Sequence, residues 1–124
     1  MYVALSRPVA LEELKRRAAK VGRPVTSFAP RVLFVLNVYL ERVLDLTQAR
    51  VRTDWDITLE DLRTDDVYDR CQEVALVARH EGYEAIRFPS ATGHGENLAI
   101  FYDRIRVASY VLLVTEEPVD LERI

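Results

Sequence analysis

Cysteine and histidine are scarce in this sequence, which contains only Cys71, His80 and His94. With one cysteine the chain cannot form an internal disulfide, and a zinc cluster built from cysteines is excluded. The two histidines lie fourteen positions apart without a neighbouring thiolate, a spacing that does not match a zinc site. We therefore expect no metal and a reducing, cytoplasmic setting.

The sequence also lacks a long hydrophobic run and an excess of positive charge. Residues 32–40 form the longest apolar stretch, which Asn37 interrupts, whereas a membrane-spanning helix needs about 20 apolar residues. No signal-peptide pattern precedes it. The 17 Lys and Arg against 20 Asp and Glu give a net charge of −3, and the aromatic residues lie outside any basic stripe. We expect neither membrane insertion nor direct nucleic-acid binding.

Common catalytic motifs are missing as well. There is no Walker-type phosphate loop, no Gly-x-Gly-x-x-Gly after a strand, and Ser90 does not lie in a Gly-x-Ser-x-Gly elbow. What remains is 124 residues with 49% hydrophobic content, an ordinary globular composition. This length predicts a single domain with one core.

The N-terminal part predicts a strand at residues 2–5 and then an amphipathic helix. Ser6 and Pro8 are typical of a helix start, and Gly22 of its end. Apolar residues share one face of this helix, namely Ala10, Leu11, Leu14, Ala18 and Val21. Its acidic residues precede its basic ones, as the helix dipole favours; we interpret Glu12, Glu13, Lys15, Arg16, Arg17 and Lys20 as solvated surface charges.

The rest of the chain predicts an α+β fold with a mixed, largely antiparallel sheet and flanking helices. Arg31 to Tyr39 reads as the most buried strand, because its apolar run is continuous. Short helical turns follow, with Thr58 and Asp61 as a capping-box pair. Apolar spacing predicts a helix from Asp65 that ends at Gly82; its apolar positions are Val67, Cys71, Val74 and Ala78. Three closely spaced strands, 83–88, 98–102 and 107–115, indicate antiparallel pairing.

The loop at residues 89–97 is the strongest candidate for a ligand-binding segment. Its two glycines allow the backbone to approach a ligand, and its polar side chains are Ser90, Thr92, His94 and Asn97. A polar hairpin connection whose glycines serve only turn geometry explains the same residues equally well. Both interpretations stay open, and His94 receives no role.

Three segments together resemble the RES domain family: RVLFVLNVYLERVLDLT at 31–47, GYEAIRFPSA at 82–91 and ENLAIF at 96–101. The resemblance implies a fold similar to ADP-ribosyltransferases. It also implies the activity of bacterial toxins that degrade NAD⁺ by phosphorolysis or hydrolysis of the nicotinamide–ribose bond. NAD⁺ would then be a substrate, no cofactor would be required, phosphate would be a possible second substrate, and an antitoxin protein would be the partner. Homodimerisation is a further possibility.

The resemblance also assigns site residues. Glu13 matches the family glutamate and Ser90 the family serine, which makes both candidate catalytic residues. Tyr2 matches a tyrosine of the family, and we expect Tyr2 and Asn97 to bind NAD⁺. Taking Glu12 as the family glutamate shifts the leucine pattern by one position. If the assignment is correct, Glu13 and Ser90 face one cleft.

The family arginine is the position that this chain does not fill. In the family it lies upstream of the tyrosine strand, where this chain begins. Residues 1–124 are therefore expected to be a single RES-like domain without the arginine-bearing segment, shortened in its gene's history or by a misplaced start at Met1. Arg31, Arg87 or Arg104 could supply positive charge, although none occupies the family position.

Three hypotheses for function follow. The chain is an NAD⁺-degrading enzyme, or a catalytically inactive remnant that serves as an antitoxin-binding module. As a third possibility it is an unrelated α+β binding domain, which would separate Glu13 from Ser90.

Overall fold

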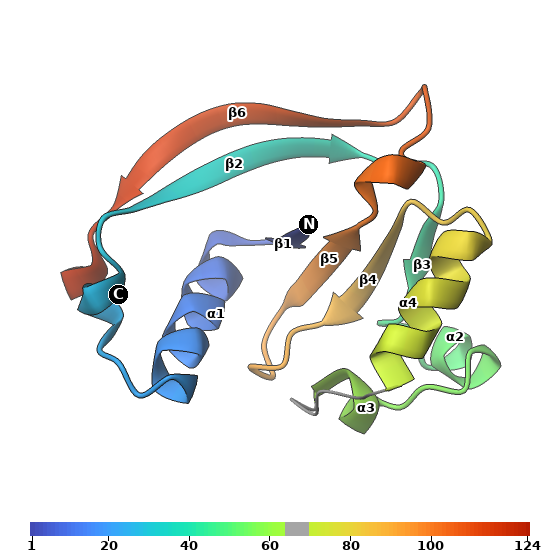
Figure 1. Cartoon of the computed structure of the whole chain (residues 1–124), viewed down its shortest axis with the longest axis horizontal. Coiled ribbons are helices and arrows are strands. Elements are labelled where there is room, and N and C mark those ends of the chain that lie inside the picture. The colour runs from blue at the N-terminus through green and yellow to red at the C-terminus, as the bar shows by residue number, and fades with distance from the viewer. Residues whose placement is uncertain (64–69) are drawn as a thin grey trace.

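The computed structural model describes residues 1–63 and 70–124 and shows an α+β fold with two sheets (Figure 1). The larger sheet has four strands in the order β1-β5-β4-β3, with bounds Tyr2–Ala4, Glu96–Ile100, Ala85–Pro89 and Val43–Asp45. Only β3 and β4 run parallel; the other neighbours are antiparallel. The expected fold class, with its mixed and largely antiparallel pairing, is confirmed.

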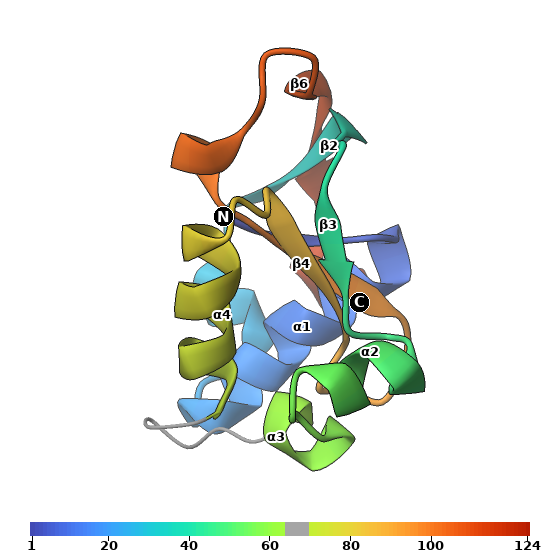
Figure 2. The ribbon, with the colours of Figure 1, turned by 90° about the vertical axis from the view of Figure 1, so that its right-hand side faces the viewer.

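A second sheet consists of β2 (Arg31–Tyr39) and β6 (Tyr110–Val119), which form an antiparallel ribbon. The ribbon arches over β1 and α1 and lies at the top of Figures 1 and 2. The prediction that residues 31–39 form the most buried strand is wrong, because alternate residues of β2 are exposed and Phe34 is 58% exposed. Its apolar run looks like that of a central strand, but β6 is its only neighbour and no described helix covers its outer face.

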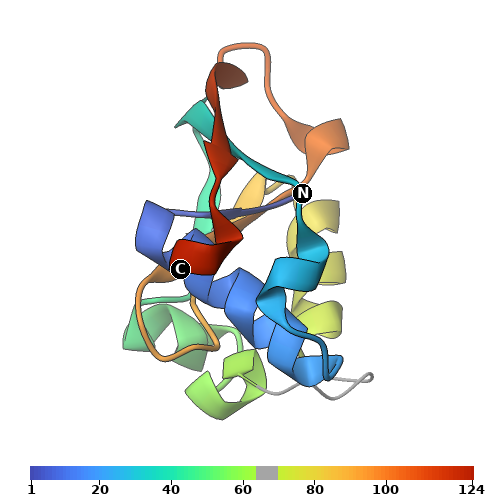
Figure 3. The same cartoon turned by 90° about the vertical axis from the view of Figure 1, so that its left-hand side faces the viewer.

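The helix α1 (Arg7–Lys20) begins and ends as the sequence predicts. The Ser6 hydroxyl accepts a hydrogen bond from the Val9 N–H, Pro8 lies in the first turn, and the chain leaves the helix at Val21 before Gly22. Figure 3 shows α1 in front of the four-stranded sheet, beside the short turn Val25–Phe28 and the C-terminal segment.

In the described part of the chain, three further helices lie beside β3 and β4, at the opposite edge of the larger sheet from β1 (Figure 2): α2 (Ala49–Asp54), α3 (Leu59–Arg63) and α4 (Arg70–His80). The predicted capping box is present, since the Thr58 hydroxyl accepts from the Asp61 N–H while the Asp61 carboxylate accepts from the Thr58 N–H. The expected start of a helix at Asp65, with Val67, lies outside the described residues. No described helix combines the length and apolar character needed to cross a membrane.

The core lies on both faces of the larger sheet. On one face, Ile86 of β4 and Leu44 of β3 pack with Val74 and Ala78 of α4. On the other, a buried cluster formed by Ala85, Leu98 and Ile100 packs against Val38 and Val111 at one end of the ribbon. The larger sheet therefore packs against helices on one face and against the ribbon on the other.

Strand positions differ from the predictions in three places. The strand β3 was not predicted, because three residues carry little periodicity and parallel pairing joins distant parts of the chain. Strands β4 and β5 are displaced by about two residues from 83–88 and 98–102, which shortens the loop between them to residues 90–95. The last strand pairs with β2 instead of β5, so the expected run of three antiparallel neighbours ends at β5.

The side chain of Glu84 joins the ribbon to the larger sheet from a fully buried position. Its Oε1 accepts hydrogen bonds from the N–H groups of Glu41 and Arg42, at 2.7 and 2.8 Å. Its Oε2 accepts from the N–H of Arg106 at 3.0 Å, in the segment that leads to β6. One carboxylate thus holds the chain after β2, the chain before β6 and the start of β4 at a single point.

Candidate active site

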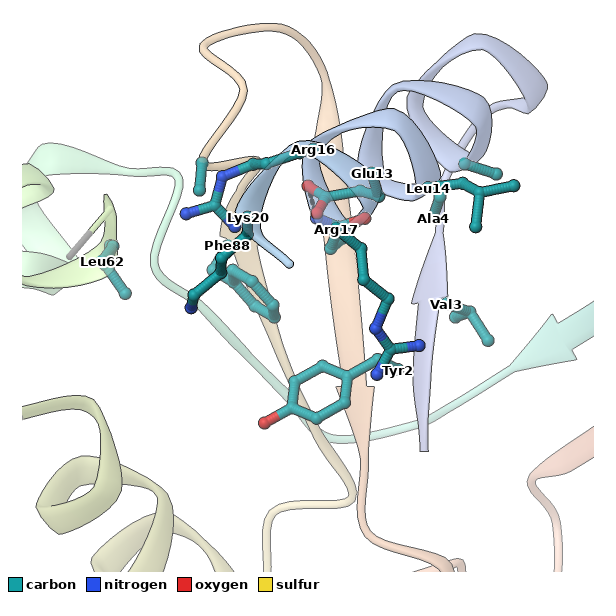
Figure 4. A pocket seen from close by; sticks show the side chains of 13 residues that line it. Tyr2, Val3, Ala4, Glu13, Leu14, Arg16, Arg17, Lys20, Leu62 and Phe88 are labelled. Atoms are coloured by element: carbon teal, nitrogen blue, oxygen red, sulfur yellow. Dashed lines mark hydrogen bonds between the residues drawn. The ribbon is translucent and has the colours of Figure 1, made fainter. Parts of the chain in front are cut away.

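A pocket of about 660 Å³ lies between α1 and the larger sheet (Figure 4). Strands β1, β5 and β4 contribute Tyr2, Ala4, Asn97 and Phe88, which the strand register places on one face of the sheet. The opposite wall is α1, and Leu62 of α3 closes one side. The residues that line this pocket thus come from segments far apart in the sequence.

Among the described residues that line the pocket, Glu13 is the single acidic residue. Its Oε1 accepts a hydrogen bond from the Ser90 hydroxyl at 2.5 Å and a longer one from the Asn97 side-chain amide at 3.3 Å. Its Oε2 has no hydrogen-bond partner in the part of the chain that the structure describes. One oxygen is therefore fixed by donors from the β4–β5 loop and from β5, and the other is available to a ligand.

Ser90 lies behind Glu13 and does not line the pocket, since its exposed fraction is 0%. Besides donating to Glu13, its hydroxyl accepts from the Thr92 N–H at 3.2 Å and lies 2.8 Å from the Thr92 hydroxyl. The Ser90 N–H donates to the Gly95 carbonyl at 2.9 Å, which closes the loop of residues 90–95 on itself. The loop thus holds the Ser90 hydroxyl in position to donate its hydrogen bond to the Glu13 carboxylate.

Gly95 is the position where this loop packs most closely against α1. It adopts φ +73°, and a Cβ built there would lie 2.1 Å from Cγ2 of Val9, whereas Gly93 has φ +86° and open space around it. We expect Gly93→Ala to lower the free energy of unfolding by about 1–2 kcal/mol through backbone strain alone. Gly95→Ala is expected to lower it by about 1–3 kcal/mol more, because Val9 must move.

Urea denaturation of the two variants measures this difference, with Gly93→Ala as the matched control. Equal destabilisation by both substitutions would show that the loop does not press against Val9 in solution.

Three basic residues of α1, Arg16, Arg17 and Lys20, also line the pocket. The interpretation of these three residues as solvated charges that serve only the helix dipole is incomplete. Counted from Glu13, they lie at i+3, i+4 and i+7, positions that share one face of a helix. That spacing was the sequence signal for them. Glu12 and Lys15 differ, since they pair with each other at 3.1 Å and do not line the pocket.

Of the predicted NAD⁺-binding residues, Tyr2 and Asn97 both line the pocket. Tyr2 is 79% exposed. Its ring lies edge-on to the ring of Phe88, with the ring centroids 6.3 Å apart. Asn97 is buried beside Glu13. The catalytic and binding roles of Glu13, Ser90, Tyr2 and Asn97 remain predictions.

The three arginines considered as alternative cations lie elsewhere. Arg87 bonds to Glu96 of the neighbouring strand, and its side chain points to the sheet face opposite Phe88 and Asn97. Arg31 lies over the Phe28 ring, 5.4 Å from its centroid, and Arg104 does not line the pocket. No group of three or more His, Cys, Asp or Glu residues in residues 1–63 and 70–124 is arranged to hold a metal ion.

Comparison with known proteins places this geometry in context. The family described as the RES domain matches residues 1–122. No curated protein sequence matches the chain. A chain in the crystal structure of the M. tuberculosis MbcT–MbcA toxin–antitoxin complex is similar in structure, with a TM-score of 0.86 and 22% sequence identity. The similarity covers 99% of the present chain and 67% of the tuberculosis chain, and it shows a shared fold.

Proposed function

The chain belongs to the RES domain family, and from this premise we propose that it cleaves the nicotinamide–ribose bond of NAD⁺ in the Glu13 pocket. The observation that carries the proposal is the Glu13 carboxylate, which Ser90 of the β4–β5 loop and Asn97 of β5 hold at the pocket surface. The solved relative of the same fold is part of a toxin–antitoxin complex, which agrees with a toxin-like activity.

The chemistry of this cleavage suits a fixed carboxylate. As the C1′–N bond breaks, its electron pair leaves with neutral nicotinamide, and positive charge develops on the ribose ring at C1′ and the ring oxygen. A negative group that is already in place stabilises this charge without reorganisation. An oxygen of phosphate or water then attacks C1′, which gives ADP-ribose 1-phosphate or, after loss of a proton, ADP-ribose. Glu13 Oε2 is placed to stabilise the cation or to hold the ribose hydroxyls.

Ser90 and Asn97 act on this chemistry through Glu13. Because Ser90 is buried behind the carboxylate, we assign it a positioning role and not contact with the reacting atoms. Asn97 donates to the same oxygen and lies at the pocket surface, where it can also bind the substrate. The exposed Tyr2 ring offers a face on which a planar base can stack.

The direct test is incubation of the purified chain with NAD⁺, with and without phosphate, followed by chromatographic detection of nicotinamide. Release of nicotinamide is expected, and the second product identifies the acceptor as phosphate or water. Intact NAD⁺ under both conditions, with a protein that melts cooperatively, contradicts the proposal.

A second candidate function, binding of a partner protein, is favoured by the exposed apolar surface of the β2–β6 ribbon. The strand β2 presents the exposed side chains of Val32, Phe34 and Tyr39. The strand β6 adds the exposed Tyr110, which pairs with Tyr39, and Leu112, which pairs with Asn37. Several exposed large apolar side chains on one ribbon are a feature of protein–protein interfaces. We propose that an antitoxin protein covers this face, and this role is compatible with the enzymatic one.

Phe34→Asp is expected to abolish co-purification of the chain with the product of a neighbouring antitoxin gene, because a charge would be buried at the interface. Val107→Asp is the matched control, since Val107 is exposed and lies outside the ribbon. Glu13→Ala should also leave co-purification unchanged. Undiminished co-purification of the folded Phe34→Asp variant would place the partner on another surface.

A further inference from the structure

The basic residues of α1 lie in a fixed order relative to Glu13. Arg17 follows Glu13 by one helical turn and Lys20 by about two, which corresponds to a rise of about 6 and 10 Å along the helix axis. Arg16 lies beside Arg17 on the same face, and all three residues line the pocket together with Glu13. Along the axis of α1, the pocket thus has a carboxylate at Glu13 and basic side chains on the next two helical turns.

Among the described residues that line this pocket, basic side chains outnumber acidic ones, whereas acidic residues outnumber basic ones in the whole chain. The protein carries a net charge of −3, yet its described pocket-lining residues include three cations and one carboxylate. One oxygen of that carboxylate already accepts two hydrogen bonds. Basic side chains gathered at a pocket attract anionic ligands.

From this order we infer that Arg16, Arg17 and Lys20 bind the diphosphate of a dinucleotide whose ribose lies at Glu13. The inference rests on the proposed function and adds the residues that bind the diphosphate of its substrate. In such a ligand, one ribose ring and its 5′ carbon separate the reacting C1′ from the first phosphate, a span similar to one turn of α1. Guanidinium groups are suited to phosphate oxygens because their N–H donors can bind two oxygens at once.

Arg17 is the central residue of this site. Figure 4 shows its side chain extending from α1 toward Tyr2, across the mouth of the pocket. In the part of the chain that the structure describes, its guanidinium forms no hydrogen bond or ion pair. Arg16 and Lys20 lie on the side toward Leu62 and Phe88 in the same view. A diphosphate bound over α1 would therefore contact Arg17 without breaking an existing contact to a described residue.

Inorganic phosphate presents the same chemistry and could occupy the same cations as the attacking group in phosphorolysis. The geometry favours the diphosphate, because three cations spread over more than one helical turn match two linked phosphates better than one. Titrations with ADP, with inorganic phosphate and with nicotinamide riboside distinguish a diphosphate ligand from inorganic phosphate.

The experiment measures dissociation constants by calorimetry with the full chain, at fixed salt concentration. ADP should bind to the wild-type protein, and Arg17→Met should weaken this binding by about tenfold to a hundredfold, because a charge-assisted contact is lost while the aliphatic stem is retained. Arg17→Lys should restore part of the affinity. Lys15→Met is the matched control on the same helix, since Lys15 pairs with Glu12 outside the pocket, and it should leave ADP binding unchanged.

Nicotinamide riboside carries no phosphate, so its affinity should not change in Arg17→Met. The inference is overturned if ADP does not bind, if Arg17→Met binds ADP as tightly as the wild type, or if inorganic phosphate binds more tightly than ADP. Because these titrations require no turnover, ADP binding that depends on Arg17 would stand even if the protein left NAD⁺ intact. Cleavage of NAD⁺ with normal ADP binding in Arg17→Met would reject this inference alone.

Discussion

Glu13→Gln is expected to lower the rate of NAD⁺ cleavage about a thousandfold and to leave the fold unchanged. The amide oxygen of glutamine can still accept the hydrogen bonds from Ser90 and Asn97, so the side chain keeps its place. What disappears is the negative charge beside C1′, and removal of one preorganised electrostatic group typically costs a factor of about 10² to 10³. Without the attraction and orientation that the charge also provides, we place the loss at the upper end of this range.

The measurement is nicotinamide release at saturating NAD⁺, compared with the same assay of Glu12→Gln. Glu12 precedes Glu13 on the same helix but pairs with Lys15 and does not line the pocket, so its variant should retain wild-type activity. This pair of variants also decides between the two alignments of the family glutamate. Loss of activity in Glu12→Gln with retention in Glu13→Gln would move the reacting centre away from the pocket described above.

Glu84→Ala is expected to have the largest effect on stability, a loss of about 3–5 kcal/mol in the free energy of unfolding. The substitution removes a fully buried carboxylate and leaves the N–H groups of Glu41, Arg42 and Arg106 without the acceptor that they share. For a domain of this size the melting temperature should fall by on the order of 10–20 °C. Differential scanning calorimetry checks this, with Glu81→Ala, an exposed glutamate on the preceding turn, as the control.

The same carboxylate makes stability depend on pH. Burial alone raises the pKa of Glu84, but hydrogen bonds from the Arg106 N–H, the Ser109 hydroxyl and the N–H groups of Arg42 and Glu41 outweigh it, so its pKa lies below its ordinary value. A lowered pKa in the folded state adds stability that is present above the ordinary value of 4.5 and is lost as the pH falls below it. Wild-type protein should therefore lose stability below that pH more steeply than Glu84→Gln. Parallel pH profiles would show that the pKa of Glu84 is the same in the folded and unfolded states, which contradicts the lowered value.

The sequence predicted those elements whose signals are local. Helix α1 carries a serine cap, an early proline and a terminal glycine, and all three features act within the helix itself. The prediction that β2 is the most buried strand failed for a different reason. An apolar run indicates which residues favour burial, but it does not indicate whether another element covers them. In the described part of the chain, β2 pairs with β6 alone, and Val32, Phe34 and Tyr39 of β2 remain exposed.

The candidate site could be predicted only in part, for a similar reason. Glu13 and Ser90 were identified through family resemblance, since a glutamate on a helix and a serine after a proline are individually ordinary. The cations at Arg16, Arg17 and Lys20 were missed because their charges were judged by position along the helix, and not by angle relative to Glu13. The role of Glu84 carries no local signal, since its partners lie more than twenty residues away in both directions.

The hydrogen bond between Ser90 and Glu13 also sets the time at which the pocket can exist during synthesis. It joins residues 77 positions apart, and the contact from Asn97 spans 84 positions. At ribosomal rates of about 5–20 residues per second, α1 waits about 4–15 s for the strands that complete its site. Contacts of such long range also slow folding, because the chain must close a large loop before they form. A nascent chain therefore carries the glutamate long before it has an assembled pocket, and the pocket is complete only after residues 90–97 have left the ribosome.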